Sequence, residues 1–234
     1  MSVIRLISRI LVGIVFIFSG FVKAIDPLGL TYKFIDYFNA FHLEFLSGIT
    51  LPLAIVLSSL ELLIGVMLLL GYRMNKTSWV LLIFMTFFTI LTFILAIFNP
   101  VSDCGCFGDA IILTNWETFW KNIILMVFVL IIFVSRKKFD QKRDVLKEWS
   151  VAVVFFLMAV LLSIYCFRHL PFIDFRPYKI GTNIPESMSI PDDAPQDVYE
   201  TKLYYKNLET GEEKEFSMDN FPKDTTRWEF IDAV

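Results

Sequence analysis

The sequence predicts an all-α membrane protein, in which a four-helix transmembrane bundle is followed by a fifth transmembrane helix and a small tail with a β-hairpin. Composition is the first observation: 56% of the 234 residues are hydrophobic and 16% are aromatic, with a mean hydropathy of +0.62. The second is that the charged residues cluster in short stretches and leave long apolar runs between them. This composition excludes a soluble enzyme. The net charge of −3 gives no basic field for phosphates, which excludes nucleic-acid binding.

Five apolar runs are long enough to cross the lipid bilayer, which requires about 20 helical residues for about 30 Å of hydrocarbon. They cover residues 4–25, 47–71, 79–99, 118–135 and 149–167. Tryptophans stand at the ends of three runs, where amphipathic rings favour the headgroup level. These are Trp79, Trp116, Trp120 and Trp149. We interpret them as interface anchors, and the alternative is that they are ordinary core aromatics.

The short loops predict the orientation of the helices. With five spans, three groups of basic residues fall on one side, and Lys and Arg are enriched in cytoplasmic loops. The groups are Arg5 with Arg9, Arg73 with Lys76, and the basic residues between 136 and 147. We therefore expect a multi-pass protein of the cell inner membrane with a cytoplasmic N-terminus and a periplasmic tail. A cleaved signal peptide at 1–24 is disfavoured, because the apolar run is long and ends in Lys23.

The predicted domain organisation follows from these runs. Residues 1–135 form the four-helix membrane bundle, 136–148 a basic cytoplasmic loop and 149–167 the fifth transmembrane helix. Prolines interrupt residues 168–196, which we expect to be a periplasmic linker. Residues 197–234 form an extension in which a β-hairpin turns near Gly211 and the stretch 228–234 opens a helix. Since a lone hairpin is marginal in water, the extension either docks on a partner or precedes a further domain.

Cys104 and Cys106, separated by Gly105, are the strongest candidates for chemistry. A disulfide between residues two apart is near the limit of permitted geometry, and Gly105 provides the backbone freedom for such a tight ring. Strain raises the reduction potential, so the pattern is typical of an exchanging pair. The flanking Asp103 and Asp109 disfavour a thiolate and the start of the following helix favours one, which leaves the pKa open. The alternatives are a static disulfide or two reduced thiols in a turn.

Other residues near the outer surface are weaker candidates. Cys166, at the outer end of the fifth helix, could resolve a mixed disulfide, although a lone cysteine in an apolar helix is usually a small buried hydrophobe. A metal site would combine the thiolates with His42, His169 or Cys166, but two distant histidines support it weakly and no metal is predicted. The aromatic-rich stretch 32–45 is expected to lie along the membrane interface near the cysteine loop or to pack on the bundle as a surface helix.

Glu61 lies near the middle of the second apolar run. A carboxyl group at that depth is costly and should face the bundle interior, with Ser58 and Gly65 on the same helical face. The functional interpretation is a proton or quinone-headgroup contact. The structural alternative is a protonated glutamate that is hydrogen-bonded to a neighbour such as Ser19, Thr89 or Thr92.

The first helix carries two further expectations. Gly13 and Gly20 lie seven residues apart on one face and, with Gly65 on the second helix, are expected to be close-packing points. Lys23 is expected at the outer surface, where its side chain extends toward the headgroups and pairs with Asp26.

The sequence Cys-Gly-Cys-Phe-Gly at 104–108 is the most specific element of a pattern that covers about residues 1–135. The pattern also includes Gly20–Lys23, Asp26–Pro27, Glu61, Gly65, Gly71, Trp116 and Lys121–Asn122. Together these residues resemble the DoxX/MauE family of small redox-associated membrane proteins, and in particular the Bacteroidetes type with an extra helix and a C-terminal periplasmic extension.

The resemblance implies a four-helix membrane bundle similar to that of vitamin K epoxide reductase. It also implies a role in disulfide formation or in the maturation of exported redox proteins, and it places that role on Cys104 and Cys106 only. Similar members often carry a periplasmic thioredoxin-like domain, so the extension at 197–234 is expected to be the start of one. The sequence holds no second outward-facing cysteine pair of the kind that relays electrons in the reductase.

We therefore expect a membrane redox-associated protein, a candidate thiol-disulfide oxidoreductase. It would exchange a disulfide or electrons with an exported thiol protein or a thioredoxin-like domain through Cys104 and Cys106. Glu61 would contact a proton or a quinone, the one cofactor considered. The alternative is a non-catalytic scaffold subunit of a larger cell-envelope maturation or export complex, which the acidic tail and the hairpin favour. Small-molecule transport lacks support, because the five runs show no inverted repeat.

Overall fold

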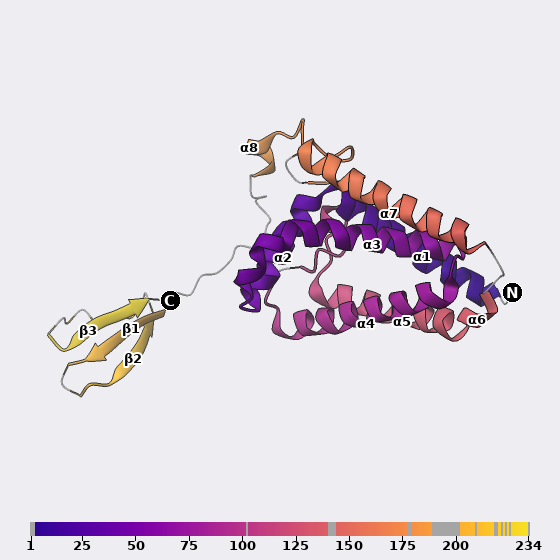
Figure 1. The fold of residues 1–234 in the computed structure, drawn as a ribbon. Helices are drawn as coiled ribbons and strands as arrows, with labels where there is room; N and C mark the ends of the chain where they lie inside the picture. The colour runs from indigo at the N-terminus through magenta and orange to yellow at the C-terminus, as the bar shows by residue number, and fades with distance from the viewer. Residues whose placement is uncertain are drawn as a thin grey trace. The chain divides into compact units, whose positions relative to one another are not determined.

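The computed structural model describes residues 3–101, 103–139, 144–176, 179–188, 202–208, 210–217, 220, 222, 224 and 226–233. Five of its helices are long and apolar enough to cross a membrane (Figure 1). They are α1 (Val3–Ile25), α3 (Thr50–Leu70), α4 (Met74–Phe98), α5 (Asn115–Val134) and α7 (Val145–Arg168). These helices coincide with the five predicted apolar runs, which confirms a mostly helical, multi-pass membrane protein.

Shorter helices connect the spans. They are α2 (Pro27–Ala40), the 3₁₀ helices η1 (Glu44–Ile49) and η2 (Gly108–Ala110), α6 (Arg136–Phe139) and α8 (Ile184–Ser187). Asp26 begins α2, because its carboxylate accepts a hydrogen bond from the backbone N–H of Gly29 at 3.0 Å. Pro27 fits the first turn of α2, where a backbone N–H has no helical partner. The chain divides into two compact units, Met1–Thr182 and Asn183–Val234.

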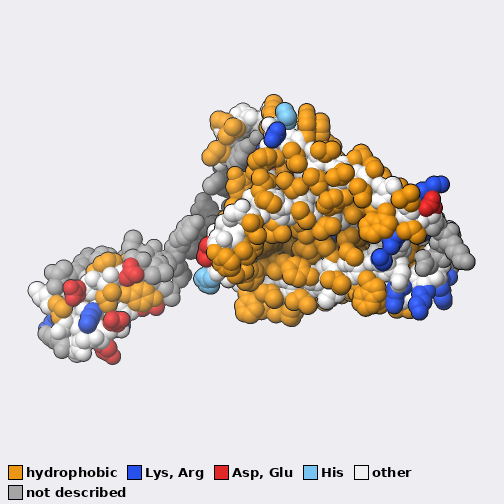
Figure 2. Space-filling view, in the orientation of Figure 1, with side chains coloured by type: hydrophobic (Ala, Val, Ile, Leu, Met, Phe, Trp, Pro, Cys, Tyr) orange, Lys and Arg blue, Asp and Glu red, His pale blue; other side chains and the backbone are white. Residues whose placement is uncertain are grey.

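The membrane bundle in the first unit has two layers (Figure 1). α1 and α3 pack along each other and α7 covers them, while α4 and α5 form the second layer and contact α3 and α1. The interior includes the fully buried side chains of Val12, Leu68, Leu81 and Val129. Figure 2 shows that the outer face of the bundle is largely hydrophobic, as expected for helices that face lipid.

Glycines allow the close approach of α1 and α3. A Cβ built on Gly20 would lie 2.5 Å from the backbone nitrogen of Leu62, and one on Gly65 would lie 2.7 Å from the backbone nitrogen of Ile17. A Cβ on Gly13 would lie 3.3 Å from the carbonyl oxygen of Gly65. The expected role of these three glycines as close-packing points is therefore confirmed, and the contact brings the polar side chains of the two helices together.

Gly65→Ala is expected to destabilise the bundle by about 1–3 kcal/mol, the usual cost of overpacking a core. The added methyl group would meet backbone atoms of α1, which cannot rotate away as a side chain could. Gly48→Ala is the matched control, because a Cβ there meets nothing within 4 Å. Thermal unfolding in detergent should show a lower Tm for the first variant and an unchanged Tm for the second. Equal Tm values would contradict the close contact.

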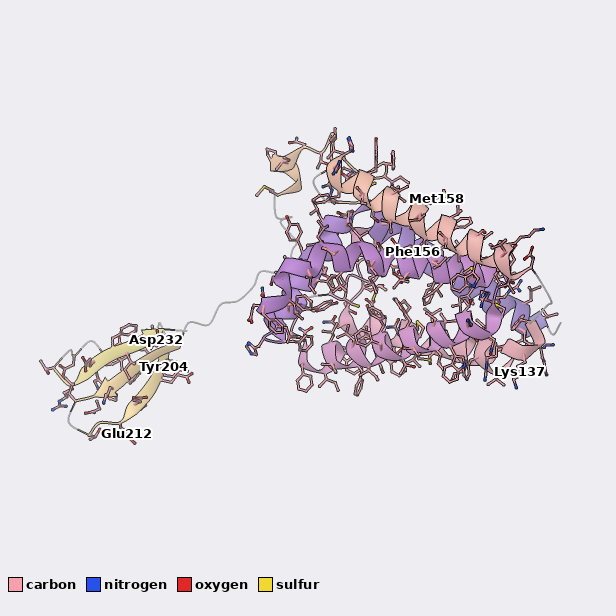
Figure 3. The ribbon with its side chains drawn as sticks, viewed as in Figure 1. Lys137, Phe156, Met158, Tyr204, Glu212 and Asp232 are labelled. Atoms are coloured by element: carbon pink, nitrogen blue, oxygen red, sulfur yellow. The ribbon has the colours of Figure 1, made fainter. Side chains whose placement is uncertain are left out.

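α7 packs on the bundle through a stripe of small residues. Ala152, Ala159, Ser163 and Cys166 are buried, and their spacing of seven, four and three residues places them on one helical face. Met158, labelled on this helix in Figure 3, is 58% exposed. Cys166 is therefore a small side chain buried against the bundle.

Basic side chains gather at one end of the bundle (Figure 2), where Figure 3 labels Lys137 of α6. The guanidinium of Arg73 lies 4.8 Å from the ring centre of Trp149, and that of Arg136 lies 5.7 Å from the ring centre of Trp79. Cations beside exposed tryptophans are typical of the membrane interface. Residues 140–143 of the predicted basic loop lie outside the described part of the chain.

The second unit contains a three-stranded antiparallel sheet in the order β2–β1–β3. β1 (Lys202–Asn207) and β2 (Glu213–Ser217) form the predicted hairpin, and Gly211 in its turn has a φ of +73°, which favours glycine. Figure 3 labels Tyr204, Glu212 and Asp232 on this unit. Residues 189–200, where the predicted linker meets the extension, lie outside the described residues.

The prediction of a helix at 228–234 is wrong, because residues Trp228–Ala233 form strand β3, antiparallel to β1. The ring of Trp228 lies 5.2 Å from that of Phe216, and the ring of Phe230 lies 5.6 Å from that of Tyr205. Aromatic residues two apart share one face of a sheet, which is the period of a strand. These cross-strand contacts depend on residues distant in sequence, and they override the short apolar pattern that indicated a helix.

Candidate functional site

The cysteine loop joins α4 to α5 and is folded around two glycines. Gly105 and Gly108 have φ values of +63° and +52°, in the left-handed region, and the N–H of Gly108 donates to the carbonyl of Gly105 at 3.1 Å. The carboxylate of Asp103 accepts a hydrogen bond from the N–H of Gly105 at 2.9 Å. α5 begins at a capping box in which Thr114 and Glu117 each bond the backbone of the other. The loop is therefore held in a defined conformation.

α2 covers the cysteine loop from one side. The hydroxyl of Tyr37 donates to the carbonyl of Cys104 at 2.6 Å, and the ammonium of Lys33 lies 2.6 Å from the carboxylate of Asp103. Burial is the largest cause that raises the pKa of Tyr37, so its hydroxyl stays protonated and remains a donor. The stretch 32–45 thus contacts the loop through α2, which was one of the two alternatives left open by the sequence.

The two thiols of the loop have different surroundings. Cys104 is 6% exposed and packs with Tyr37 and Leu95, whereas Cys106 is only partly buried and lines a cavity inside the bundle. Both are free cysteines, and their side chains are hydrogen-bonded to each other. The sequence treated the two cysteines as equivalent, and the fold makes them unequal.

Their acidities differ accordingly. The hydrogen bond to Cys106 and then burial raise the pKa of Cys104 well above its ordinary value. The same hydrogen bond, followed by the charges of Lys121 and Lys23, lowers the pKa of Cys106 to about 6, against the opposing effects of burial and Glu61. Cys106 is therefore the more acidic thiol of the pair, and Cys104 is the one that keeps its proton to higher pH.

A buried polar network lies beside Cys106. The ammonium of Lys23 donates to one carboxylate oxygen of Glu61 at 2.7 Å and to the hydroxyl of Ser19 at 3.0 Å. The same hydroxyl lies 2.7 Å from the other carboxylate oxygen of Glu61 and 2.7 Å from the carbonyl oxygen of Cys106. Ser19 therefore links the Lys23–Glu61 pair to the backbone of the cysteine loop. The contact of Glu61 with Ser19 was among those expected from the sequence.

The prediction that Lys23 extends toward the headgroups and pairs with Asp26 is wrong. Lys23 is 7% exposed and its partner is Glu61 of α3. A charge in a low-dielectric interior is costly unless it is paired, and the close packing at Gly20 brings the two helices near enough for the pair to form.

The polar groups meet at a cavity of about 30 Å³ between the two layers of the bundle. Ser19, Lys23, Glu61, Cys106 and Lys121 form its polar lining, and the remaining walls are apolar, with Phe16, Phe84 and Phe88 among them. Lys121 also lies over the ring of Phe107, with its ammonium 4.3 Å from the ring centre. A cavity of this volume is large enough for water.

The remaining sequence candidates lie elsewhere. Cys166 lines a different cavity, together with Asp26, Arg168, His169 and Arg176, and neither cysteine of the loop is part of that lining. Within the described residues no group of three or more His, Cys, Asp or Glu side chains is arranged to hold a metal ion. The structure therefore brings Glu61 to the cysteine loop and leaves Cys166 apart from it.

Sequence reasoning missed Lys23 and Lys121 as parts of this site. The signal for Lys23 was present, because a lysine and a glutamate in two adjacent apolar runs are expected to pair inside a bundle. Ser19, four residues before Lys23, shares its helical face. Lys121 stands near the start of the fourth apolar run, where a surface position was equally consistent with the pattern.

Lys121→Met is expected to raise the pKa of Cys106, because the variant removes a cation that lowers it. The midpoint of Cys106 alkylation should move from about pH 6 to a higher pH, which slows alkylation at neutral pH. The measurement is the alkylation rate against pH in a Cys166→Ser background, with the modified peptide identified by mass. Lys76→Met, which removes an exposed lysine, is the control and should leave the profile unchanged. An unchanged profile for Lys121→Met would contradict the assigned role.

Five membrane-spanning helices and a buried Lys–Glu pair beside a Cys-Gly-Cys loop define a multi-pass membrane protein with a thiol site at one end of its bundle. The family model described as methylamine utilisation protein MauE matches residues 1–135, more than half of the chain. The chain therefore belongs to the MauE family, and the resemblance to DoxX/MauE proteins is confirmed.

A second model, a domain of unknown function (DUF8463), matches residues 199–234, which include the three-stranded sheet. No curated protein and no solved structure matches the chain.

Proposed function

We propose that this MauE-family membrane protein exchanges a disulfide with an exported partner through Cys104 and Cys106. The observation that carries the proposal is the inequality of the two thiols. Cys106 combines partial exposure with a lowered pKa, and Cys104 is buried with a raised pKa. A nucleophile and a resolving thiol need this difference, because the thiolate is the attacking species.

The exchange proceeds in two steps when the loop is reduced. The Cys106 thiolate attacks one sulfur of the partner's disulfide, a mixed disulfide forms, and the electron pair of the broken S–S bond leaves on the partner's second sulfur. Cys104 then gives up its proton and attacks the Cys106 sulfur, which closes the Cys104–Cys106 disulfide and releases the partner. The partner leaves as a dithiol, with one proton from Cys104 and one from solvent. Each step is reversible, so the relative reduction potentials decide whether the partner is oxidised or reduced.

The partner and the location belong to the same proposal. The partner is an exported thiol protein or a thioredoxin-like domain, the protein lies in the inner membrane, and its N-terminus is cytoplasmic with the cysteine loop and the tail outside. The cluster of basic side chains around α6, at one end of the bundle, supports this orientation.

The cavity supports a charge or proton role for Glu61 rather than a quinone contact. Pockets that hold small organic ligands have volumes of about 300–1,000 Å³. The cavity beside Glu61 has about 30 Å³, which is a volume for water and not for a quinone ring.

The test uses purified chain with Cys166→Ser, oxidised at the loop, and a reduced peptide with a Cys-x-x-Cys pair. We expect one peptide disulfide to form for each loop disulfide that is lost, measured by mass after acid quenching. A chain with serine at both Cys104 and Cys106 is the control. A peptide that stays reduced beside the oxidised chain would overturn the proposal.

A scaffold subunit of an envelope complex is the second candidate. The tail sheet favours it, because β2 and β3 are outer strands and Phe230 and Ile231 of β3 are 52% and 45% exposed. Outer strands can add a strand from a partner. A stable co-purified complex that persists in the double serine variant, without any thiol adduct, would favour the scaffold over the exchanger.

A further inference from the structure

The charges around Cys106 balance in only one state of the cysteine pair. The cavity is lined by two cations, Lys23 and Lys121, and by one carboxylate, Glu61. With a disulfide at the loop these groups sum to +1, and with a Cys106 thiolate they sum to zero. An uncompensated charge is costly in a low-dielectric interior, so the cavity favours the reduced, ionised state of Cys106.

Lys23 is fixed in place by two partners rather than by one. Its ammonium donates to Glu61 at 2.7 Å and to Ser19 at 3.0 Å, and an ammonium has a third N–H, which neither of these contacts uses. Ser19 also contacts the Cys106 carbonyl at 2.7 Å, so the loop and the lysine share one anchor. The lysine therefore keeps its position relative to Cys106.

Several elements pack around Cys106 and bring titratable groups toward it. The titratable groups that face Cys106 are Lys23 of α1, Tyr37 of α2, Glu61 of α3, Lys121 of α5 and Cys104 of the loop. α4 contributes Phe84, Met85 and Phe88 to the cavity, none of which titrates. Among these groups the lysines supply the positive charge that a thiolate requires.

We propose that Lys23, positioned by Glu61 and Ser19, holds Cys106 as a thiolate in the reduced loop, so that reduction of the cysteine pair takes up two electrons but only one proton. This inference rests on the proposed exchange function and specifies its proton balance. Lys23 acts through its charge, and Glu61 and Ser19 are positioning residues.

Reduction of the loop by a thiol reductant transfers two electrons. Two thiols of a reductant such as glutathione lose two electrons and two protons as they form a disulfide. The loop S–S bond breaks and each sulfur gains one electron. Cys104 takes one of the protons, Cys106 remains a thiolate beside Lys23, and the second proton goes to solvent. The cavity changes from +1 to neutral.

A purely structural ion pair explains the geometry less well. Replacing a buried ion pair by apolar residues is often neutral or stabilising, so stability alone gives little reason for such a pair. Here the pair lies beside the candidate nucleophile and shares the Ser19 hydroxyl with it. A role for the pair in the state of Cys106 accounts for that placement.

The experiment equilibrates full-length chain carrying Cys166→Ser with fixed concentrations of reduced and oxidised glutathione at a series of pH values. The ratio of reduced to oxidised loop is read by acid quenching and maleimide mass tagging. With one proton taken up, the ratio rises about tenfold for each pH unit above about pH 6, until the glutathione thiol itself ionises. With two protons taken up, the ratio is independent of pH.

Two variants assign the effect to Lys23. Lys23→Met removes one cation from the cavity, so the rise in the ratio should begin at a higher pH, and Glu61→Gln, which removes the carboxylate, should move it to a lower pH. Lys23→Arg keeps the charge and should keep the original profile. Lys76→Met, in an exposed position, controls for loss of a lysine in general.

A loop that equilibrates with glutathione but shows a ratio independent of pH upholds exchange and overturns the one-proton claim. A rise at the same pH in Lys23→Met and in the parent overturns the role of Lys23. A loop that never responds to glutathione overturns the proposed function, and this inference falls with it.

Discussion

Cys104→Ser is expected to accumulate a mixed disulfide between Cys106 and the exported partner, whereas Cys106→Ser is expected to lose that adduct by at least about tenfold. The reason is the inequality of the two thiols. Cys106 is the more exposed and the more acidic, so it attacks, and Cys104 is buried, so its main task is to resolve the adduct. Without the Cys104 thiol, no intramolecular attack breaks the mixed disulfide, so the adduct accumulates.

The measurement is the recovery of partner-linked chain from cells after acid quenching, on non-reducing gels and by mass spectrometry. Cys166→Ser is the matched control, because Cys166 lines a different cavity and its loss should leave the adduct unchanged. Equal adduct levels in the two loop variants would contradict the assignment of attacking and resolving thiols. Loss of the adduct in Cys166→Ser would show that the third cysteine, and not Cys106, forms it.

Lys23→Met is expected to destabilise the bundle by about 3–5 kcal/mol, the usual effect of removing one partner of a buried ion pair. Glu61 would remain 6% exposed with no cation at 2.7 Å, and it would have to remain as a buried charge or take up a proton. Lys23→Met/Glu61→Gln is expected to regain most of the loss, because neither charge remains and the amide can still bond Ser19.

Thermal unfolding of the purified variants in the same detergent checks this prediction, with the exposed Lys76→Met as the control. A double variant as unstable as Lys23→Met would indicate that shape, and not charge pairing, stabilises this contact. A single variant as stable as the parent would indicate that Glu61 is neutral beside Lys23.

The membrane spans could be predicted from the sequence because the bilayer requires long apolar helices, and the length of each apolar run can be read directly from the sequence. The glycine contacts of α1 and α3 followed from spacing on one helical face, as did the inward position of Glu61. These features depend on local sequence and on the surrounding lipid, so a single sequence is sufficient to predict them.

Features that depend on distant segments could not be predicted in the same way. Trp228 and Phe230 form a strand because β1 and β2 offer cross-strand aromatic partners. Cys104 is buried against Tyr37 of α2, and Lys121 of α5 lowers the pKa of Cys106; no spacing rule brings either residue to the loop. The sequence predicted a surface position for Lys23 because Lys23 lies in the last turn of the first apolar helix. Its partner, Glu61, lies on another helix and could not be identified from local sequence.

The most direct test of the central claim is the redox state of Cys104 and Cys106 in intact cells. Cells that express the Cys166→Ser chain are quenched with acid and labelled with a mass-tagged maleimide, with and without prior reduction. The proposal predicts a pair that is oxidised in part and that shifts toward the dithiol when reduced exported proteins accumulate. A pair that stays in one state under both conditions, with no phenotype for either serine variant, would make the motif a structural turn and contradict the exchange function.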